Sequence, residues 1–252
     1  MGTITIEMQG AIAVLTLADG VTNAVGSQMT HDLAAALEEA AATSRGLVLA
    51  GNDTFFSMGF NLPELIQLDR QGMRAFIHAF ERATLDLFTL PLPTAAAIEG
   101  HAIAGGTILG LAADFRIAAA GKKLMGLNEI KLGIPVPCLA LMMLEQTVSR
   151  PVAQEMLYHG EFVKAEQALD TGLVDEVVAP GFAVERALAR LASIAAHPGG
   201  AFRAMKAARV EIIRDKFERT YVEQHERFLD CWFQADTRVL LEEAAEKFRK
   251  GA

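Results

Sequence analysis

The sequence predicts an α/β fold in which pairs of strands alternate with helices. Residues 3–7 and 11–17 alternate or run apolar around Gln9-Gly10, which is typical of a β-hairpin. Residues 46–51 form an apolar run bracketed by glycines, as expected of a strand buried on both faces. The β,β,α order recurs two or three times along the chain and indicates a layered sheet structure.

Helices are expected after both of these segments. The first begins at Ser27, a possible N-cap, with Leu33, Ala36, Leu37 and Ala40 at helical spacing. A second is indicated by an apolar stripe at Met73, Phe76, Ile77, Phe80, Leu87 and Phe88. His78 lies off that stripe and is expected to face solvent. Pro91 and Pro93 end the second helix.

The segment 55–62 directly follows the buried strand. Loops at the carboxyl ends of strands are where open α/β sheets bind ligands. Ser57 lies in this segment, but no G-x-S-x-G elbow surrounds it, so we interpret it as a loop serine rather than a nucleophile. Residues 63–71 mix polar and apolar side chains and could form a mobile segment.

The stretch from Thr94 to Ala120 is the centre of the sequence. A strand-like run, 94–98, leads to Ala104-Gly105-Gly106 and then to an apolar helical segment that ends near Asp114. Glycines allow a sharp turn and a close approach of a ligand to the main chain, and a helix N-terminus favours a negative oxygen. The stretch predicts either an anion site built from backbone N–H groups or a turn that only permits tight helix–strand packing.

Glu129 is a carboxylate among apolar neighbours in a segment rich in glycine and proline. One interpretation is an exposed ion pair with Lys131, which contributes little to stability. The other is a carboxylate whose pKa is raised by an apolar pocket, as a general base requires. The residues alone leave both interpretations open.

The chain divides near residue 195. Helical patterns cover 139–148, 151–158 and 165–170, and residues 173–178 form a last strand-like run. Beyond a break at Pro198-Gly199-Gly200, long amphipathic helices continue to the end. We therefore expect a core of residues 1–195 and a helical region of residues 196–252.

Composition excludes several classes of protein. The net charge of −8 argues against a general nucleic-acid binder, and no apolar run is long enough to span a membrane. The N-terminus lacks the pattern of a secretory signal, and the two cysteines, Cys138 and Cys231, favour a reducing cytoplasm over a disulfide framework. The six histidines fall at no metal-ligand spacing, so no metal site is expected.

Five segments in order make the chain resemble the enoyl-CoA hydratase/isomerase (crotonase) superfamily. They are Asn23-Ala24, Phe56-Ser57-Met58-Gly59, Glu99-Gly100 through Asp114, Leu127-Asn128-Glu129 through Pro135, and Ala165 through Asp175. The likeness covers nearly the whole chain. It implies a crotonase-like spiral of repeated β-β-α units, with a C-terminal helical region that forms a homotrimer or a dimer of trimers.

The resemblance also implies an acyl-CoA substrate and no separate cofactor. The thioester oxygen would lie in an oxyanion hole made by the backbone N–H groups of Met58 and Gly105. Substrate contacts are expected from Ala24, Phe56, Gly59, Phe60, Asn61, Leu62 and Ile108. The resemblance implies an acyl pocket lined by Phe60, Leu62, Leu65 and Ile66, and plain core packing is an equally good account of these four residues. In the last helix, Lys247 and Arg249 either approach the CoA 3′-phosphate or belong to a solvated face.

Two departures from the family pattern bear on the chemistry. Family hydratases use two glutamates, and here the first position is Ile108 while the second is kept as Glu129. A single carboxylate can still move a proton from C2 to C4, which is the pattern of the Δ3,Δ2-enoyl-CoA isomerases. Asn61 stands where the family more often has aspartate.

The sequence therefore predicts an isomerase with Glu129, Met58 and Gly105 as its catalytic groups. A hydratase or a thioester hydrolase that uses Glu129 with a bound water is the alternative within the superfamily. A non-catalytic acyl-CoA binding protein is the alternative from another class.

Overall fold

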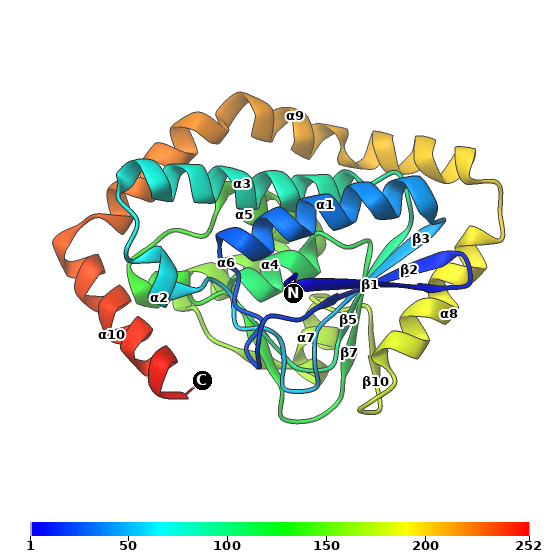
Figure 1. The fold of residues 1–252 in the computed structure, drawn as a ribbon, viewed down its shortest axis with the longest axis horizontal. Helices are drawn as coiled ribbons and strands as arrows, with labels where there is room; N and C mark the ends of the chain where they lie inside the picture. Colours follow the sequence, from blue (N-terminus) through cyan, green and yellow to red (C-terminus); the bar gives the residue numbers. More distant parts are fainter. Residues whose placement is uncertain (1, 252) are drawn as a thin grey trace.

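A six-stranded sheet forms the centre of the fold in the computed structural model, which describes residues 2–251 (Figure 1). Its strand order is β1-β2-β3-β5-β7-β10, with bounds Ile4–Gln9, Ile12–Leu17, Gly46–Ala50, Thr94–Ile98, Phe115–Ala119 and Glu176–Val178. The predicted hairpin is present as the antiparallel pair β1–β2, and the other neighbours pair in parallel.

The two middle strands β3 and β5 are buried along their whole length. Their register places Leu47 opposite Thr94 and Leu49 opposite Ala96. Helices cover both faces of this part of the sheet, which explains why residues 46–51 read as a continuous apolar run rather than an alternating one.

A second sheet of very short strands lies next to the site described below. It has the order β4-β6-β8-β9, with bounds Phe55–Ser57, His101–Ile103, Leu124–Gly126 and Val163–Lys164. Along the chain, each of three strands of the first sheet is followed by a strand of the second sheet and then by a helix. The three units are β3-β4-α2, β5-β6-α4 and β7-β8-η1. This is the predicted repeat of β-β-α units.

Helices α1 (Ser27–Thr43) and α3 (Arg70–Thr89) pack against each other on one side of the molecule (Figure 1). The prediction of Ser27 as N-cap is wrong by one residue: Gly26 is the N-cap, and the Ser27 N–H and hydroxyl donate to Glu64 Oε1. His78 is half-buried against Tyr221 and His225, not facing solvent as expected.

On the other side, α8 (Ala183–Ala195) packs on β3, β5 and β7. Its buried residues Ala187 and Leu191 join a small second core with Val48 and Ile117. The remaining shorter helices are α2 (Leu62–Leu65), α4 (Gly105–Leu111), the 3-10 helix η1 (Glu129–Leu132), α5 (Cys138–Thr147), α6 (Arg150–His159) and α7 (Ala165–Thr171). The segment expected to be mobile, 63–71, contains most of α2 and the N-terminus of α3.

The last two helices extend over the rest of the molecule. Helix α9 (Gly199–Trp232) runs along α3, and α10 (Ala235–Gly251) turns down to contact α2 and η1 (Figure 1). Three of the residues buried in α9 and α10, Phe217, Trp232 and Leu241, belong to the main core. Among the described residues, none of the helices combines the length and the apolar character needed to span a bilayer.

Candidate active site

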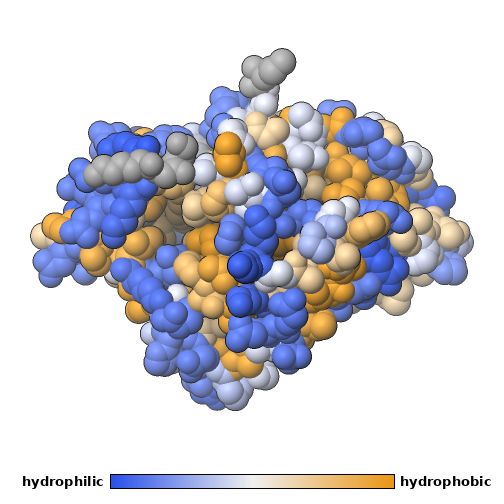
Figure 2. Space-filling view, turned by 90° about the horizontal axis from the view of Figure 1, so that it is seen from below, coloured by the Kyte–Doolittle hydropathy of each residue, from blue (hydrophilic) through white to orange (hydrophobic). Residues whose placement is uncertain are grey.

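A cavity of about 310 Å³ opens between the second sheet, η1 and α10. On the side where Figure 1 shows α10, the face in Figure 2 is hollowed and its lining is largely hydrophobic. The cavity, called here the Glu129 cavity, is lined by Thr22, Met58, Phe60, Leu62, Ile103, Ala104, Gly105, Asn128, Glu129, Leu132, Ile134, Ala244, Lys247 and Phe248. Within this set Glu129 is the only carboxylate.

Asn23 and Ser57 hold together two of the loops that shape the cavity. Asn23 is buried in a left-handed conformation with φ 47°, which asparagine tolerates. Its side-chain amide donates to the carbonyls of Phe55 at 3.1 Å and Phe56 at 3.3 Å. The Ser57 hydroxyl donates to the Asn23 carbonyl at 2.7 Å and accepts from the Gly59 N–H at 3.1 Å. Ser57 is the last residue of β4 rather than a loop residue, and its buried hydroxyl is used in this structural network.

Two glycines allow the loop after β4 to approach the start of α4. Gly59 has φ +89°, and a Cβ there would lie 2.7 Å from the Ile103 carbonyl oxygen and 3.0 Å from the Gly105 nitrogen. A Cβ on Gly106 would lie only 2.3 Å from the Ser57 carbonyl oxygen. Any side chain at either position would push the two segments apart.

The N-terminus of α4 supplies an open hydrogen-bond donor. Ala104, its N-cap, has φ 48° and ψ −112°, a strained conformation for a residue with a side chain. No acceptor within residues 2–251 takes the N–H of Gly105, which borders the cavity. The Met58 N–H, in contrast, donates to the Thr22 carbonyl at 2.9 Å. Of the two expected oxyanion-hole donors, one is therefore open and the other is paired within the chain.

Glu129 is a buried base candidate. Its side chain is 4% exposed, its Oε2 atom has no hydrogen-bond partner, and burial raises its pKa to about 7. The alternative of an ion pair with Lys131 is wrong, because Lys131 Nζ pairs with Glu161 Oε1 at 2.7 Å instead. The neighbouring Asn128 Oδ1 also lacks a partner. The cavity thus contains an acid group whose pKa lies close to neutral pH.

Helix α10 closes the cavity with Ala244, Lys247 and Phe248. Its N-terminal turn is anchored by the Thr237 hydroxyl, which donates to the Gly133 carbonyl at 3.2 Å. Lys247 is exposed at the cavity, whereas Arg249 does not line it.

The structure brings only some of the predicted site residues to the cavity. Met58, Phe60, Leu62, Gly105 and Glu129 line it. Ala24, Phe56 and Ile108 are buried, with exposed fractions of 3%, 0% and 1%, and neither they nor Gly59 and Asn61 line the cavity. Asn61 is the N-cap of α2, where its side chain accepts from the Glu64 N–H at 3.4 Å. Leu65 and Ile66 belong to the core.

Several lining residues carry no signal in the sequence. Thr22 and Ile103 adjoin predicted motifs, but Ala244 and Phe248 come from a helix more than a hundred residues away from Glu129. Their position follows from the packing of α10 on α2 and η1. His101, the histidine nearest the proposed site in sequence, has a structural role as expected: its Nδ1 accepts from the Leu124 N–H at 3.0 Å.

A model of the enoyl-CoA hydratase/isomerase family matches residues 7–249. Over 176 residues the chain is 32% identical to the probable enoyl-CoA hydratase EchA17 of Mycobacterium tuberculosis, an alignment that covers 69% of this chain and 67% of that protein. The crystal structure of human mitochondrial delta3-delta2-enoyl-CoA isomerase superposes with a TM-score of 0.94 at 24% identity, covering 99% of both chains.

An enoyl-CoA hydratase from Bacillus halodurans also superposes, with a TM-score of 0.88 at 23% identity, over 96% of this chain and 100% of that one. At these identities the two superpositions show a shared fold. The family match extends over almost all of the sequence, so the chain belongs to the enoyl-CoA hydratase/isomerase family and has the crotonase fold.

Proposed function

We propose that the protein is an enoyl-CoA isomerase that moves a double bond from C3 to C2. The observation that carries the proposal is Glu129, the one carboxylate among the described residues that line a largely apolar cavity. Ile108, where the resemblance places the first hydratase glutamate, is an apolar residue with 1% of its surface exposed. One carboxylate suits a proton shuttle better than the paired acid and base of hydration.

In the proposed mechanism the thioester carbonyl oxygen accepts a hydrogen bond from the Gly105 N–H. The Met58 N–H joins it after exchanging the Thr22 carbonyl for the substrate oxygen. Glu129 removes a proton from C2, and the electron pair of that C–H bond forms a dienolate whose negative charge rests on the thioester oxygen. Return of the proton to C4 leaves the double bond between C2 and C3 and restores the Glu129 carboxylate.

The pKa of Glu129, raised to about 7, supports this role because a base works best when its pKa lies near the working pH. Phe60 and Leu62 would contact the acyl chain, and Lys247 would contact a phosphate of CoA. The proposed chemistry needs no cofactor beyond the CoA that the substrate carries.

The alternative is a hydratase or thioester hydrolase in which Glu129 activates a water. It is favoured by the name of the Mycobacterium tuberculosis relative, a probable enoyl-CoA hydratase. The test is to incubate the purified protein with 3-enoyl-CoA and, separately, with 2-enoyl-CoA. We expect the 3-enoyl compound to become the 2-enoyl compound. Formation of 3-hydroxyacyl-CoA or of free CoA would contradict the proposal, and binding without turnover would favour the non-catalytic alternative.

We also propose that the helical region 196–252 assembles the chain into a homotrimer or a dimer of trimers in the cytoplasm. Large apolar side chains on the surface of α9 support assembly: Met205, Ile212 and Val222 are 65%, 77% and 63% exposed. Light scattering on the purified protein should give three or six times the chain mass of 27.1 kDa. A mass equal to one chain would contradict this proposal.

A further inference from the structure

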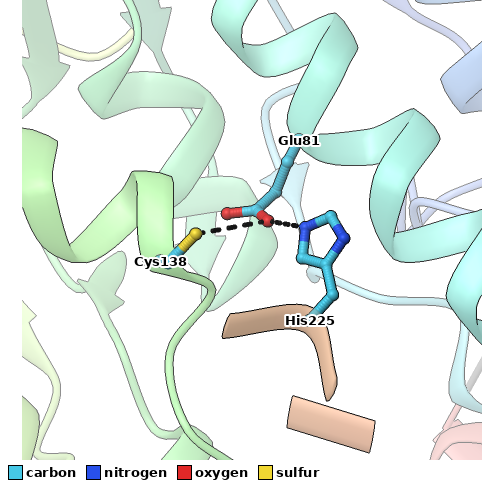
Figure 3. A group of neighbouring side chains, drawn as sticks. All are labelled: Glu81, Cys138 and His225. Carbon is cyan, nitrogen blue, oxygen red and sulfur yellow. Dashed lines mark hydrogen bonds and ion pairs between the residues drawn. The ribbon is translucent and has the colours of Figure 1, made fainter. Parts of the chain in front are cut away.

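Three side chains from three helices meet outside the Glu129 cavity. Figure 3 shows Glu81 of α3, Cys138 at the start of α5 and His225 of α9 pointing toward one another. His225 Nε2 lies 2.5 Å and Cys138 Sγ lies 3.7 Å from the same atom, Glu81 Oε2. One carboxylate oxygen, the sulfur and one ring nitrogen all lie within 4.8 Å of one another. We call these residues the Glu81 cluster.

Two members of the cluster are buried, Cys138 is partly buried, and the cluster has its own cavity. Glu81 is 1% exposed and His225 is 4% exposed. A cavity of about 180 Å³ is bordered by all three residues and by Cys231. The other carboxylate oxygen, Glu81 Oε1, accepts from the Leu139 N–H at 2.7 Å, which fixes the carboxylate with Oε2 toward the other two side chains.

We propose that the Glu81 cluster binds a divalent metal ion of the Zn²⁺ type, with a water from the adjoining cavity as the fourth ligand. Thiolate, imidazole and carboxylate are the ligands that Zn²⁺ takes in proteins, at about 2.0–2.3 Å. In a tetrahedron such ligands lie roughly 3.3–3.6 Å from one another. The sulfur–oxygen separation of 3.7 Å already fits, and the His225–Glu81 pair has to open by less than about 1 Å. The sulfur and the ring nitrogen lie within 4.8 Å of each other and have to reach about 3.6 Å.

Charge balance favours an ion at this position. Binding of a divalent cation to the Cys138 sulfur releases the thiol proton to solvent. The thiolate and the Glu81 carboxylate then carry two negative charges against the two positive charges of the ion, and an imidazole that binds through Nε2 adds no charge.

An ion here would join three helices and hold one end of the segment that carries Glu129. Residues 133–137 connect η1 with α5, and Pro135, Val136 and Pro137 border the same small cavity. The site would therefore fasten α9 and α5 to α3 and fix the chain just after Glu129–Leu132.

The test is a titration of the full-length, metal-free, reduced protein with Co²⁺, followed by absorption spectroscopy. We expect the wild type to bind one ion per chain, with a sulfur-to-cobalt charge-transfer band and the intense visible bands of a tetrahedral ion. Cys138→Ser should lose the charge-transfer band, and His225→Gln should weaken binding at least tenfold. Cys231→Ser is the matched control and should behave like the wild type.

A second measurement guards against variants that fail to fold. Zn²⁺ should raise the melting temperature of the wild type and of Cys231→Ser, but not that of Cys138→Ser, whose fold is checked by circular dichroism. The absence of a charge-transfer band in the wild type, or a band that persists in Cys138→Ser, would overturn the metal site. Neither measurement uses an acyl-CoA, so the metal site and the proposed isomerase activity are tested independently of each other.

Discussion

Two buried glutamates of this protein have opposite surroundings. Glu129 is 4% exposed and Glu81 is 1% exposed. Glu129 lines a cavity and its buried Oε2 has no partner, whereas Glu81 receives hydrogen bonds from Leu139, His225 and Cys138. Burial is thus nearly the same for the two carboxylates, and the number of donors around them differs.

The difference separates reactivity from stability. A buried carboxylate with an oxygen that has no donor is costly as an anion, so its pKa rises and it can exchange a proton near neutral pH. A buried carboxylate whose oxygens are paired fastens the elements that carry its partners. Glu129 therefore has the surroundings of an acid–base group, and Glu81 those of a structural or metal-binding group.

The largest expected effect is on turnover. Glu129→Gln removes the proton acceptor while it keeps the shape of the side chain, so we expect kcat to fall by about 10²- to 10⁴-fold or more with acyl-CoA binding retained. Glu161→Gln is the matched control, because Glu161 lies on the surface and pairs with Lys131. Wild-type turnover in Glu129→Gln would contradict the proposal that Glu129 is the acid–base group.

Glu81→Ala should act on stability. It leaves buried His225 without its partner and removes the acceptor of the Leu139 N–H, so we expect the free energy of unfolding to fall by about 3–5 kcal/mol. Urea denaturation followed by circular dichroism measures the change. A loss below about 1 kcal/mol would show that the donors around Glu81 contribute little.

A methyl group near the Gly105 N–H, the open donor of the proposed oxyanion hole, should also slow the reaction. In Gly59→Ala the Cβ would lie 3.0 Å from the Gly105 nitrogen, and we expect kcat to fall by about 10²-fold, as when one oxyanion donor is lost. Gly181→Ala is the control for backbone strain alone, because Gly181 has φ +88° and no atom within 4 Å of an added Cβ. Equal losses in both variants would assign the effect to strain.

The last prediction concerns pH. The folded-state pKa of Glu129 is raised from 4.5 to about 7, so the folded protein keeps a proton that the unfolded chain releases. The contribution of Glu129 to the free energy of unfolding is fully present below pH 4.5 and is lost as the pH rises through about 7. Glu129→Gln has no group that titrates at this position. The free energy of unfolding of the variant, relative to that of the wild type, should therefore rise by roughly 3 kcal/mol between pH 4 and pH 8. A constant difference across that range, measured by urea denaturation, would contradict the raised pKa.

Long, patterned elements were predictable from the sequence, and short ones were not. The hairpin, the buried strand 46–50 and helices α1 and α3 follow from hydrophobic periodicity over many residues. The strands of the second sheet are two or three residues long, which is too short to show an alternation of apolar and polar residues. Their pairing depends on glycines such as Gly59 and Gly106 that permit close backbone contact.

For the site, local motifs located Glu129, Gly105 and Met58, but not what surrounds them. The choice between an exposed ion pair and a buried base needed the position of Glu161, thirty residues away from Lys131. The Thr22 carbonyl that pairs with the Met58 N–H comes from yet another loop. The Glu81 cluster has no sequence signal, because its members are 57 and 144 residues from Glu81.

The central claim is that Glu129 alone acts as both base and acid, and its most direct test is to follow the proton that leaves C2. A 3-enoyl-CoA carrying deuterium at C2 is converted in ordinary water, and NMR locates the label in the product. If Glu129 alone removes and returns the proton inside a secluded cavity, a substantial share of the deuterium must be found at C4 of the 2-enoyl product. A product that carries only ordinary hydrogen at C4, or a hydroxyl at C3, would contradict a single carboxylate as both base and acid.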